Sequence, residues 1–229
     1  MNKNLVLSAA IGYNFDQIKN FIISLRKYFS GEVHIIIDKN ENKLEQEILK
    51  YDCKSIKTSI NKKRIQFKRY KIYLEFLKDK KFDNILLCDS RDIYFQNDPF
   101  KYDYKKTINF FLEDHIIKDC PYNSNWILKT YGKSKFDMMS KKTILCSGTV
   151  LGNYNKIKEY LHLMNNYIEK YRYRKKLKYL LTFRPDPEGR GCDQAHANFI
   201  VHNNLIKNIK LHKNSDGPIA TVFYLKKIN

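Results

Sequence analysis

The first hundred residues alternate between short apolar runs and longer segments whose apolar positions recur every three or four residues. Residues 5–9, 33–37 and 84–88 are apolar runs that predict buried strands. Between them, helical spacing predicts a helix that begins near Asp16 and a second over residues 64–77. This alternation of strand and helix predicts right-handed crossovers and a mainly parallel sheet, in an α/β fold.

The second half is less regular, and its elements differ more in length. Its predicted elements are strands at residues 107–112 and 143–146, a long helix over 155–179, a loop over 184–191, a helix over 192–201 and strand-like ends to the segment 209–222. We find no internal repeat, low-complexity tract or linker in the sequence. The chain is therefore expected to form one domain over residues 1–229.

Composition narrows the class of protein. The 229 residues are 43% hydrophobic and 14% aromatic, enough to bury a core. The apolar run at residues 5–10 is shorter than the core of a usual signal peptide, so a first strand is favoured over a secretion signal. Five widely spaced cysteines without a C-x-x-C pair predict free thiols in a reducing, cytoplasmic compartment.

The chain carries a formal net charge of +19, but this charge is weak evidence for nucleic-acid binding. Only 8 of its 43 basic residues are arginine, and no recognition module for nucleic acid is readable. Basic residues cluster at positions 54–81 and 156–184, the second cluster being interleaved with tyrosines. Such a cluster is typical of a solvated helix face, or of peripheral contact with an anionic membrane or a phosphate-bearing substrate.

Acidic residues stand where the predicted strands end, in a protein that is basic as a whole. In open α/β sheets ligands bind outside the carboxyl ends of the strands, and the acids at those ends are Asp38, Asp89, Asp92, Glu113 and Asp114. Carboxylates that converge on one rim repel one another unless a cation lies among them. Their oxygens are ligands that Mg²⁺ and Mn²⁺ prefer, although an Asp at a strand end also commonly caps a turn.

Two further polar features draw attention. His212 lies near a predicted strand end, where histidine is usually structural; as a ligand it would favour Mn²⁺ or Mg²⁺ over Ca²⁺. Asp193 and Gln194 open a predicted helix directly after the predicted loop. They fit either a helix cap or a polar pair that faces a bound sugar.

Taken in order, these segments resemble the GT-A glycosyltransferases, especially glycosyltransferase family 8 and related bacterial and viral enzymes. Residues 7–13 resemble the first strand and nucleotide-binding turn, 87–100 the Asp-x-Asp segment, 144–153 the Asn-Ala-Gly-Val-Leu strand, 193–198 the Asp-Gln-Asp-x-Leu-Asn element and 211–217 the C-terminal His-x-x-Gly segment. The acid motif here is Asp-x-x-Asp, and Ala195 stands where the family has the second Asp of Asp-Gln-Asp.

The resemblance implies an α/β fold of GT-A type, with a nucleotide-binding half at residues 1–100 and an acceptor-binding half at 101–229. It implies a metal-dependent enzyme that moves a sugar from a nucleoside diphosphate sugar to a glycan or lipid-linked acceptor, with retention favoured. Asp92 and His212 would hold Mn²⁺ or Mg²⁺. Asp89 would be a third ligand, although alignment on the following strand places Ser90, not Asp89, at the family's first Asp.

The resemblance also assigns residues to the donor and to catalysis. Asp193 and Gln194 are the catalytic candidates, as a base in an inverting reaction or as support on the sugar's near face in a retaining one. Asp38 could bind the donor or could equally well be a plain strand-end Asp. Arg91 could contact the donor or could neutralise the neighbouring Asp89 and Asp92. The donor-binding candidates are Ala9, Ala10, Gly12, Tyr13, Asp38, Arg69, Arg91, Ser147, Gly148 and Gly217.

Two other classes of function remain open on the sequence. A nucleotidyltransferase also uses carboxylates and a metal, but it usually has a Gly-rich loop with a cation after the first strand; residues 10–14 contain one Gly and no cation. A basic module that binds nucleic acid or membrane would explain the charge but not the acids at the strand ends. We therefore expect a cytoplasmic enzyme that can contact the inner face of a membrane.

Overall fold

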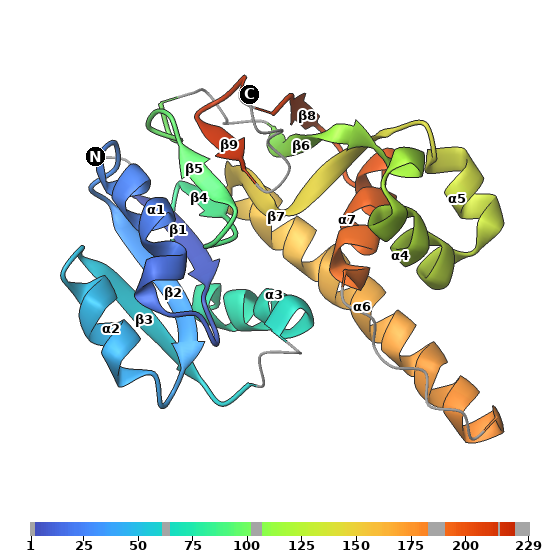
Figure 1. The fold of residues 1–229 in the computed structure, drawn as a ribbon, viewed down its shortest axis with the longest axis horizontal. Coiled ribbons are helices and arrows are strands. Elements are labelled where there is room, and N and C mark those ends of the chain that lie inside the picture. The colour runs from blue at the N-terminus through green and yellow to red at the C-terminus, as the bar shows by residue number, and fades with distance from the viewer. Residues whose placement is uncertain (1–2, 61–64, 102–106, 183–190, 215, 223–229) are drawn as a thin grey trace.

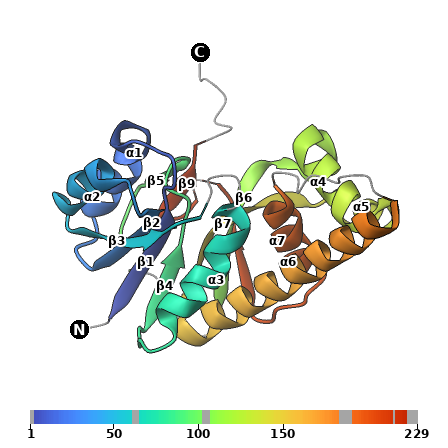
Figure 2. The same cartoon turned by 90° about the horizontal axis from the view of Figure 1, so that it is seen from below.

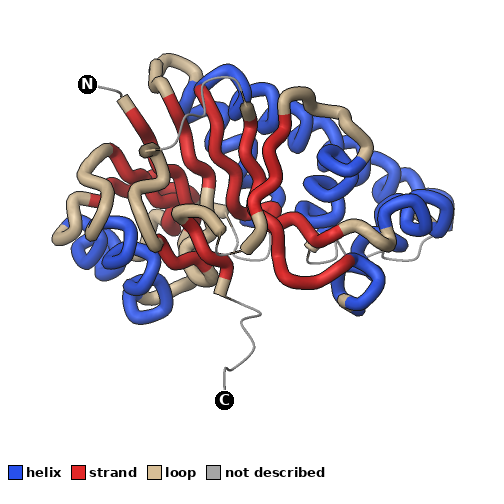
Figure 3. The backbone as a smooth tube through the Cα atoms, turned by 90° about the horizontal axis from the view of Figure 1, so that it is seen from above, coloured by secondary structure: helices blue, strands red, loops and turns tan. Residues whose placement is uncertain are grey.

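The computed structural model describes residues 3–60, 65–101, 107–182, 191–214 and 216–222 (Figure 1). Its main sheet has seven strands in the order β3-β2-β1-β4-β7-β6-β8, and a second sheet pairs β5 with β9. Figure 3 shows the strands side by side, with helices on both sides of them. The predicted α/β fold, with a mainly parallel mixed sheet flanked by helices, is confirmed.

The part of the chain up to residue 87 forms mutually parallel strands, as predicted. Its strands β1, β2, β3 and β4 span Asn4–Ala9, Glu32–Asp38, Cys53–Thr58 and Asn84–Leu87, and its helices α1, α2 and α3 span Phe15–Arg26, Asn42–Leu49 and Ile65–Leu77. The three predicted strands and two predicted helices are confirmed; residue 64 of the second helix lies outside the described residues. α2 and β3 were not predicted.

The rest of the chain adds the antiparallel strand of the main sheet. Its elements are β5 (Ile93–Phe95), β6 (Ile108–Ile116), the 3₁₀ turn η2 (Ile117–Asp119), α4 (Pro121–Tyr131), α5 (Lys133–Met139), β7 (Thr143–Asn153), α6 (Tyr154–Thr182), α7 (Cys192–His202), β8 (Ile209–His212) and β9 (Ile219–Thr221). β7 runs antiparallel to both β4 and β6. β6 and β7 are both longer than predicted. Of the predicted loop over 184–191, all but the last residue lies outside the described residues.

The two faces of the sheet bury separate sets of side chains, because successive residues of a strand point to opposite faces. In β1, Leu5 and Leu7 pack with α3, α6 and α7, whereas Val6 packs with α1 and α2. Figure 2 shows α3 and α6 on the face opposite α1 and α2. The continuous apolar runs in the sequence thus arise from strands that are covered on both faces.

The five cysteines are free and buried, which confirms the prediction of unpaired thiols. They lie in different parts of the core and serve as small apolar side chains there. Across the described ranges, no helix has both the length and the apolar character needed to cross a bilayer.

The start of α1 offers a test of local stability. The Asn14 side chain accepts a hydrogen bond from the Gln17 amide at 3.1 Å, and the Gln17 side chain accepts one from the Asn14 amide, forming a capping box. We expect Asn14→Ala to lower the free energy of unfolding by about 1 kcal/mol, measured by urea denaturation. Asn20→Ala, an exposed position within the same helix, is the control. Equal losses in the two variants would contradict the cap.

Candidate active site

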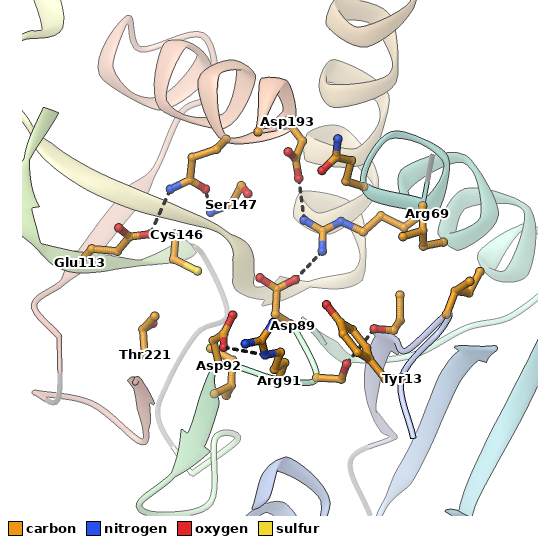
Figure 4. A pocket seen from close by; sticks show the side chains of 18 of the residues that line it. Tyr13, Arg69, Asp89, Arg91, Asp92, Glu113, Cys146, Ser147, Asp193 and Thr221 are labelled. Carbon is orange, nitrogen blue, oxygen red and sulfur yellow. Dashed lines mark hydrogen bonds and ion pairs between the residues drawn. The ribbon is translucent and has the colours of Figure 1, made fainter. Parts of the chain in front are cut away.

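A cavity of about 740 Å³ opens beside the carboxyl ends of β1 and β4. Its walls come from both halves of the chain: the turn after β1, helix α3 and the segment after β4 on one side, and β6, β7, α4 and α7 on the other (Figure 4). This is the edge of the sheet at which the sequence places its candidate chemistry.

Arg69 of α3 joins the two walls of the cavity. One guanidinium nitrogen contacts a carboxylate oxygen of Asp89, and the other lies 2.9 Å from the Asp193 carboxylate and 3.2 Å from the Tyr70 hydroxyl. Arg69 is only 8% exposed and Asp193 only 5%. Burial raises the pKa of Asp193, and the charge of Arg69 opposes that shift. The predicted donor arginine and the predicted catalytic carboxylate are therefore one buried ion pair.

The segment after β4 presents two carboxylates to the cavity. Ser90, between them in sequence, turns its hydroxyl back to the Ala9 carbonyl at 2.8 Å and fixes the backbone there. Asp92 lies 3.7 Å from the Arg91 guanidinium. Burial raises the pKa of Asp92, and the nearby charge of Asp89 raises it further. Such repulsion makes the pair a favourable place for a cation.

Glu113 of β6 is a third carboxyl in the cavity, held by a chain of hydrogen bonds. The Gln194 side chain donates to one Glu113 oxygen at 3.0 Å and accepts from the Ser147 amide at 2.8 Å. The other Glu113 oxygen is buried and has no hydrogen-bond partner among the described residues. Burial raises the pKa of Glu113 to about 7, with the charge of Asp89 adding to the effect and the bond from Gln194 opposing it.

Gly148 was selected from the sequence as a donor-binding residue, but the structure gives it a different role, beside Asp89. β4 and β7 pair antiparallel with Leu87 opposite Val150, so two residues further along Asp89 comes opposite position 148. A Cβ atom at Gly148 would lie 1.9 Å from the nearest Asp89 carboxylate oxygen. The glycine thus makes room for Asp89, which Arg69 holds in place, and it is not part of the cavity lining, although the resemblance implies that it binds the donor.

The nucleotide-binding candidates divide into two groups. Ala9 and Tyr13 line the cavity, whereas Ala10 is buried and does not line it. Gly12 has a left-handed backbone (φ 70°), and its amide donates to Glu41 at 2.8 Å. The Asp38 carboxylate accepts the Asn40 amide at 3.0 Å, as a strand-end Asp commonly does, and lies outside the cavity lining.

The C-terminal candidates also lie outside the cavity lining. His212 of β8 stacks on Phe111 with ring centroids 5.1 Å apart, and its Nε2 lies 2.9 Å from the Asn109 side-chain oxygen. The Gly217 carbonyl accepts the Gln96 side-chain amide at 3.2 Å. His212 therefore lies outside the lining of the cavity that contains Asp92, whereas the resemblance implies that both residues bind one metal ion.

Several cavity residues were not selected from the sequence. Glu113 was noted as a strand-end acid but given no role, and Trp126 and Cys146 carried no signal beyond their type. Burial raises the pKa of Cys146 to about 12, so this thiol stays protonated. The Trp126 ring lies against Gly191, where any Cβ would overlap it. Gln66, Asn123 and Thr221 also line the cavity, and each has a buried polar atom without a partner in the described structure.

The charges in the cavity are unbalanced. Two arginines, Arg69 and Arg91, face four carboxyl groups, those of Asp89, Asp92, Glu113 and Asp193. Among the described side chains, no three His, Cys, Asp or Glu residues are already gathered as a metal site. Mg²⁺ and Mn²⁺, however, are often held by one or two carboxylates with phosphate oxygens and water completing the shell. Asp89 and Asp92 fit that donor set.

Comparison with known proteins adds a likeness of fold. No protein-family model and no curated protein matches the chain. Among solved structures, the chain is similar to the apo form of the glycosyltransferase GlyE from Streptococcus pneumoniae TIGR4, with a TM-score of 0.48 and 16% identity. The match covers 92% of this chain and 45% of GlyE, so the chain spans less than half of that protein's length. Function must therefore be argued from the cavity itself.

Replacing Gly148 tests the packing of Asp89. We expect Gly148→Ala to displace the Asp89 carboxylate and weaken its ion pair with Arg69, with a loss of stability on the order of 1–3 kcal/mol in urea denaturation. Gly152→Ala on the same strand is the matched control, because a Cβ there makes only ordinary contacts, at 3.5 Å or more. Equal stability in the two variants would show that Asp89 moves aside freely.

The pKa of Glu113 predicts a pH dependence of stability. A carboxyl with a raised folded pKa binds more protons when folded, so its ionisation destabilises the fold as pH rises from about 4.5 through about 7. Glu113→Gln cannot ionise. Its stability relative to the wild type should therefore increase across that window and level off above it, in urea denaturation at several pH values. Glu75→Gln, an exposed control, should follow the wild-type curve; a parallel curve for Glu113→Gln would contradict the shift.

Proposed function

We propose that the chain is a glycosyltransferase that moves a sugar from a nucleoside diphosphate sugar to an acceptor hydroxyl in this cavity. The observation that carries the proposal is the excess of carboxylates at the carboxyl ends of β1 and β4, in a protein with a net charge of +19. A locally acidic cavity at this edge of the sheet suits a divalent cation together with a diphosphate.

Asp89 and Asp92 are the residues that would hold Mn²⁺ or Mg²⁺, and His212 is left out of the ligand set. A cation there supplies Lewis-acid stabilisation of the charge that grows on a leaving diphosphate. Asp92 has its carboxylate beside Arg91, so a cation on Asp92 leaves the Arg91 guanidinium available to the phosphates. Asp89 is oriented by its ion pair with Arg69.

The nucleoside end of the donor is proposed to lie along Ala9 and the Tyr13 ring, which form the wall next to β1. An aromatic ring offers a flat surface for a base, and an alanine allows close approach to the backbone. Asp38 and Gly12 are not needed in this arrangement, because their polar groups are engaged within the turn.

Asp193 and Gln194 are proposed to position other groups. Asp193 is paired with Arg69, and both ends of the Gln194 amide are bonded. Retention, which the resemblance implies, leaves the departing phosphate as the proton acceptor. Glu113 is the carboxyl that would serve as base in an inverting reaction, because one of its oxygens has no described partner. NMR assignment of the product anomer distinguishes the two outcomes.

The acceptor is proposed to be a glycan or lipid-linked sugar, reached from the side of the cavity formed by α4 and α7. Asn123 and Trp126 of α4 stand there, an amide and an aromatic ring. Amide groups bond sugar hydroxyls, and aromatic rings pack on the apolar faces of sugars. We place the enzyme in the cytoplasm, where nucleotide sugars and free thiols both occur.

Asp92→Asn tests the proposal directly. This substitution keeps the shape of the side chain and removes the charge that would hold a cation. For the wild type we expect thermal stabilisation by UDP-glucose, UDP-galactose or GDP-mannose that needs Mn²⁺ or Mg²⁺, equivalent to about 2.7 kcal/mol at one hundred times Kd. Asp92→Asn should lose most of this shift, and sugar transfer with it, while its melting temperature without ligand stays close to the wild type.

Asp79→Asn, a surface acid outside the cavity, is the control and should behave as the wild type. Full donor binding by Asp92→Asn, or by the wild type in excess EDTA, would overturn the proposed metal site. A salt-sensitive shift with an oligonucleotide and none with any nucleotide sugar would instead indicate a nucleic-acid-binding protein.

A further inference from the structure

Helix α6 has two apolar faces, and only one of them faces the protein. Over its first five turns, one side of the helix is buried against α3, α7 and the sheet. The buried residues are Ile157, Tyr160, Leu161, Met164, Ile168 and Tyr171. Their spacing of three and four is that of an ordinary amphipathic helix, and the series ends at Tyr171.

Beyond Tyr171 the helix continues for three turns with different exposure. No described side chain from residue 172 to 181 is buried. In Figure 1 this end of α6 extends at the lower right, away from the sheet. Yet it carries four large apolar side chains that are open to solvent: Tyr173 is 70% exposed, Leu177 47%, Leu180 56% and Leu181 74%.

The four side chains form one stripe, which we call the outer stripe: Tyr173, Leu177, Leu180 and Leu181. At 100° per residue they fall within an arc of roughly 100°. The centre of that arc lies roughly 165° around the helix from the centre of the buried series. The outer stripe is therefore not a continuation of the core-facing side; it points the opposite way.

Basic side chains border the outer stripe. The sequence from 170 to 178 contains six Lys and Arg residues, and no acidic residue occurs between Glu169 and Asp186. Arg174 and Lys176 are exposed, and lie roughly 80° to either side of the centre of the stripe. An apolar stripe flanked by cations on a helix is the pattern of a helix that lies in the headgroup region of a bilayer.

We propose that the outer stripe and its flanking cations dock the protein on an anionic membrane surface. The leucines and Tyr173 would enter the boundary between headgroups and acyl chains, and the cations would contact lipid phosphates. Nucleic acid would satisfy the cations but leave the leucines exposed. A second copy of the chain would bring like charges together across the contact. Charge complementarity thus favours an anionic bilayer over both.

The proposal stands apart from the proposed enzymatic activity, since it uses none of the cavity residues. It is tested with the full-length protein and phosphatidylcholine vesicles that contain either no phosphatidylglycerol or about one third of it. We expect the protein to sediment with the anionic vesicles, at least tenfold more tightly than with the neutral ones, and to be released by salt.

Two sets of variants distinguish membrane binding by the outer stripe from binding by the overall net charge. Leu177→Gln/Leu180→Gln/Leu181→Gln keeps the charge and should weaken vesicle binding about tenfold or more. The matched control replaces three other exposed leucines: Leu49→Gln/Leu128→Gln/Leu205→Gln. Because all six side chains are exposed, neither change should unfold the protein, which circular dichroism verifies.

The charge variant is Arg174→Glu/Lys176→Glu, with Lys101→Glu/Lys141→Glu as a control of equal net charge at exposed sites elsewhere. The α6 variant should lose at least tenfold in affinity for anionic vesicles, and the control much less. In addition, Tyr173→Trp should show a blue-shifted emission on anionic vesicles that the wild type, with Trp126 alone, does not show.

Three results would overturn the proposal. The first is equal binding to neutral and anionic vesicles. The second is equal losses in the α6 variants and their controls, which would show that the net charge alone binds the membrane. The third is a dimer in sedimentation velocity that the triple leucine variant converts to a monomer, which would show that a second copy covers the outer stripe.

Discussion

The guanidinium of Arg69 is the interaction on which the cavity depends. It comes from α3 in the first half of the chain and holds Asp89, just after β4. It also holds Asp193, at the start of α7, which lies 124 residues after Arg69 in the chain. Arg69 and Asp193 would each be expensive to bury alone, because an unpaired charge of low exposure loses its hydration. Together they neutralise one another in part, and so they fix the distance between the two walls of the cavity.

This arrangement leaves a surplus of negative charge. Arg69 is shared by two carboxylates, and Arg91 accompanies Asp92, so Glu113 lacks a cationic partner among the described contacts. Burial then raises the pKa of Glu113 to about 7, and the charge of Asp89 adds to the shift. The cavity is thus acidic within a strongly basic protein. The long-range field of the whole chain attracts anions such as nucleotide sugars, whereas the short-range field inside the cavity favours a cation. An anion that carries a divalent ion would satisfy both fields.

Much of the fold follows from the sequence because its central strands are buried on both faces. Residues 5–9, 33–37 and 84–88 are apolar without interruption, which predicts β1, β2 and β4. β3 lies at the edge of the sheet and reads as mixed polar residues, and α2 is only eight residues long, so neither was predicted. The polar Ser147-Gly148 pair hid the continuation of β7 through the cavity wall.

The site was predictable only as far as position along a strand determines it. Asp89 and Asp92 were found because they follow a buried strand, whereas Arg69 was selected from the resemblance. Glu113 was noted as a strand-end acid but was given no role, because the resemblance assigns none to it; β6 in fact continues past it to Ile116. His212 was expected in the site from its motif. On β8, however, it pairs with Phe111 of β6, and its ring faces the Asn109 side chain. The register between two strands depends on how the whole chain packs, so it cannot be read from a single sequence.

The antiparallel strand β7 explains why residues so distant in sequence meet. A parallel strand beside β4 would bring its own end to the cavity edge, as β1 does. β7 instead runs past this edge of the sheet, so its middle residues, Ser147 and Gly148, lie beside the carboxyl end of β4. The missing side chain at Gly148 admits Asp89, and the Ser147 amide anchors Gln194 of α7. One reversal of strand direction therefore places the backbone of the second half directly against the carboxylates of the first.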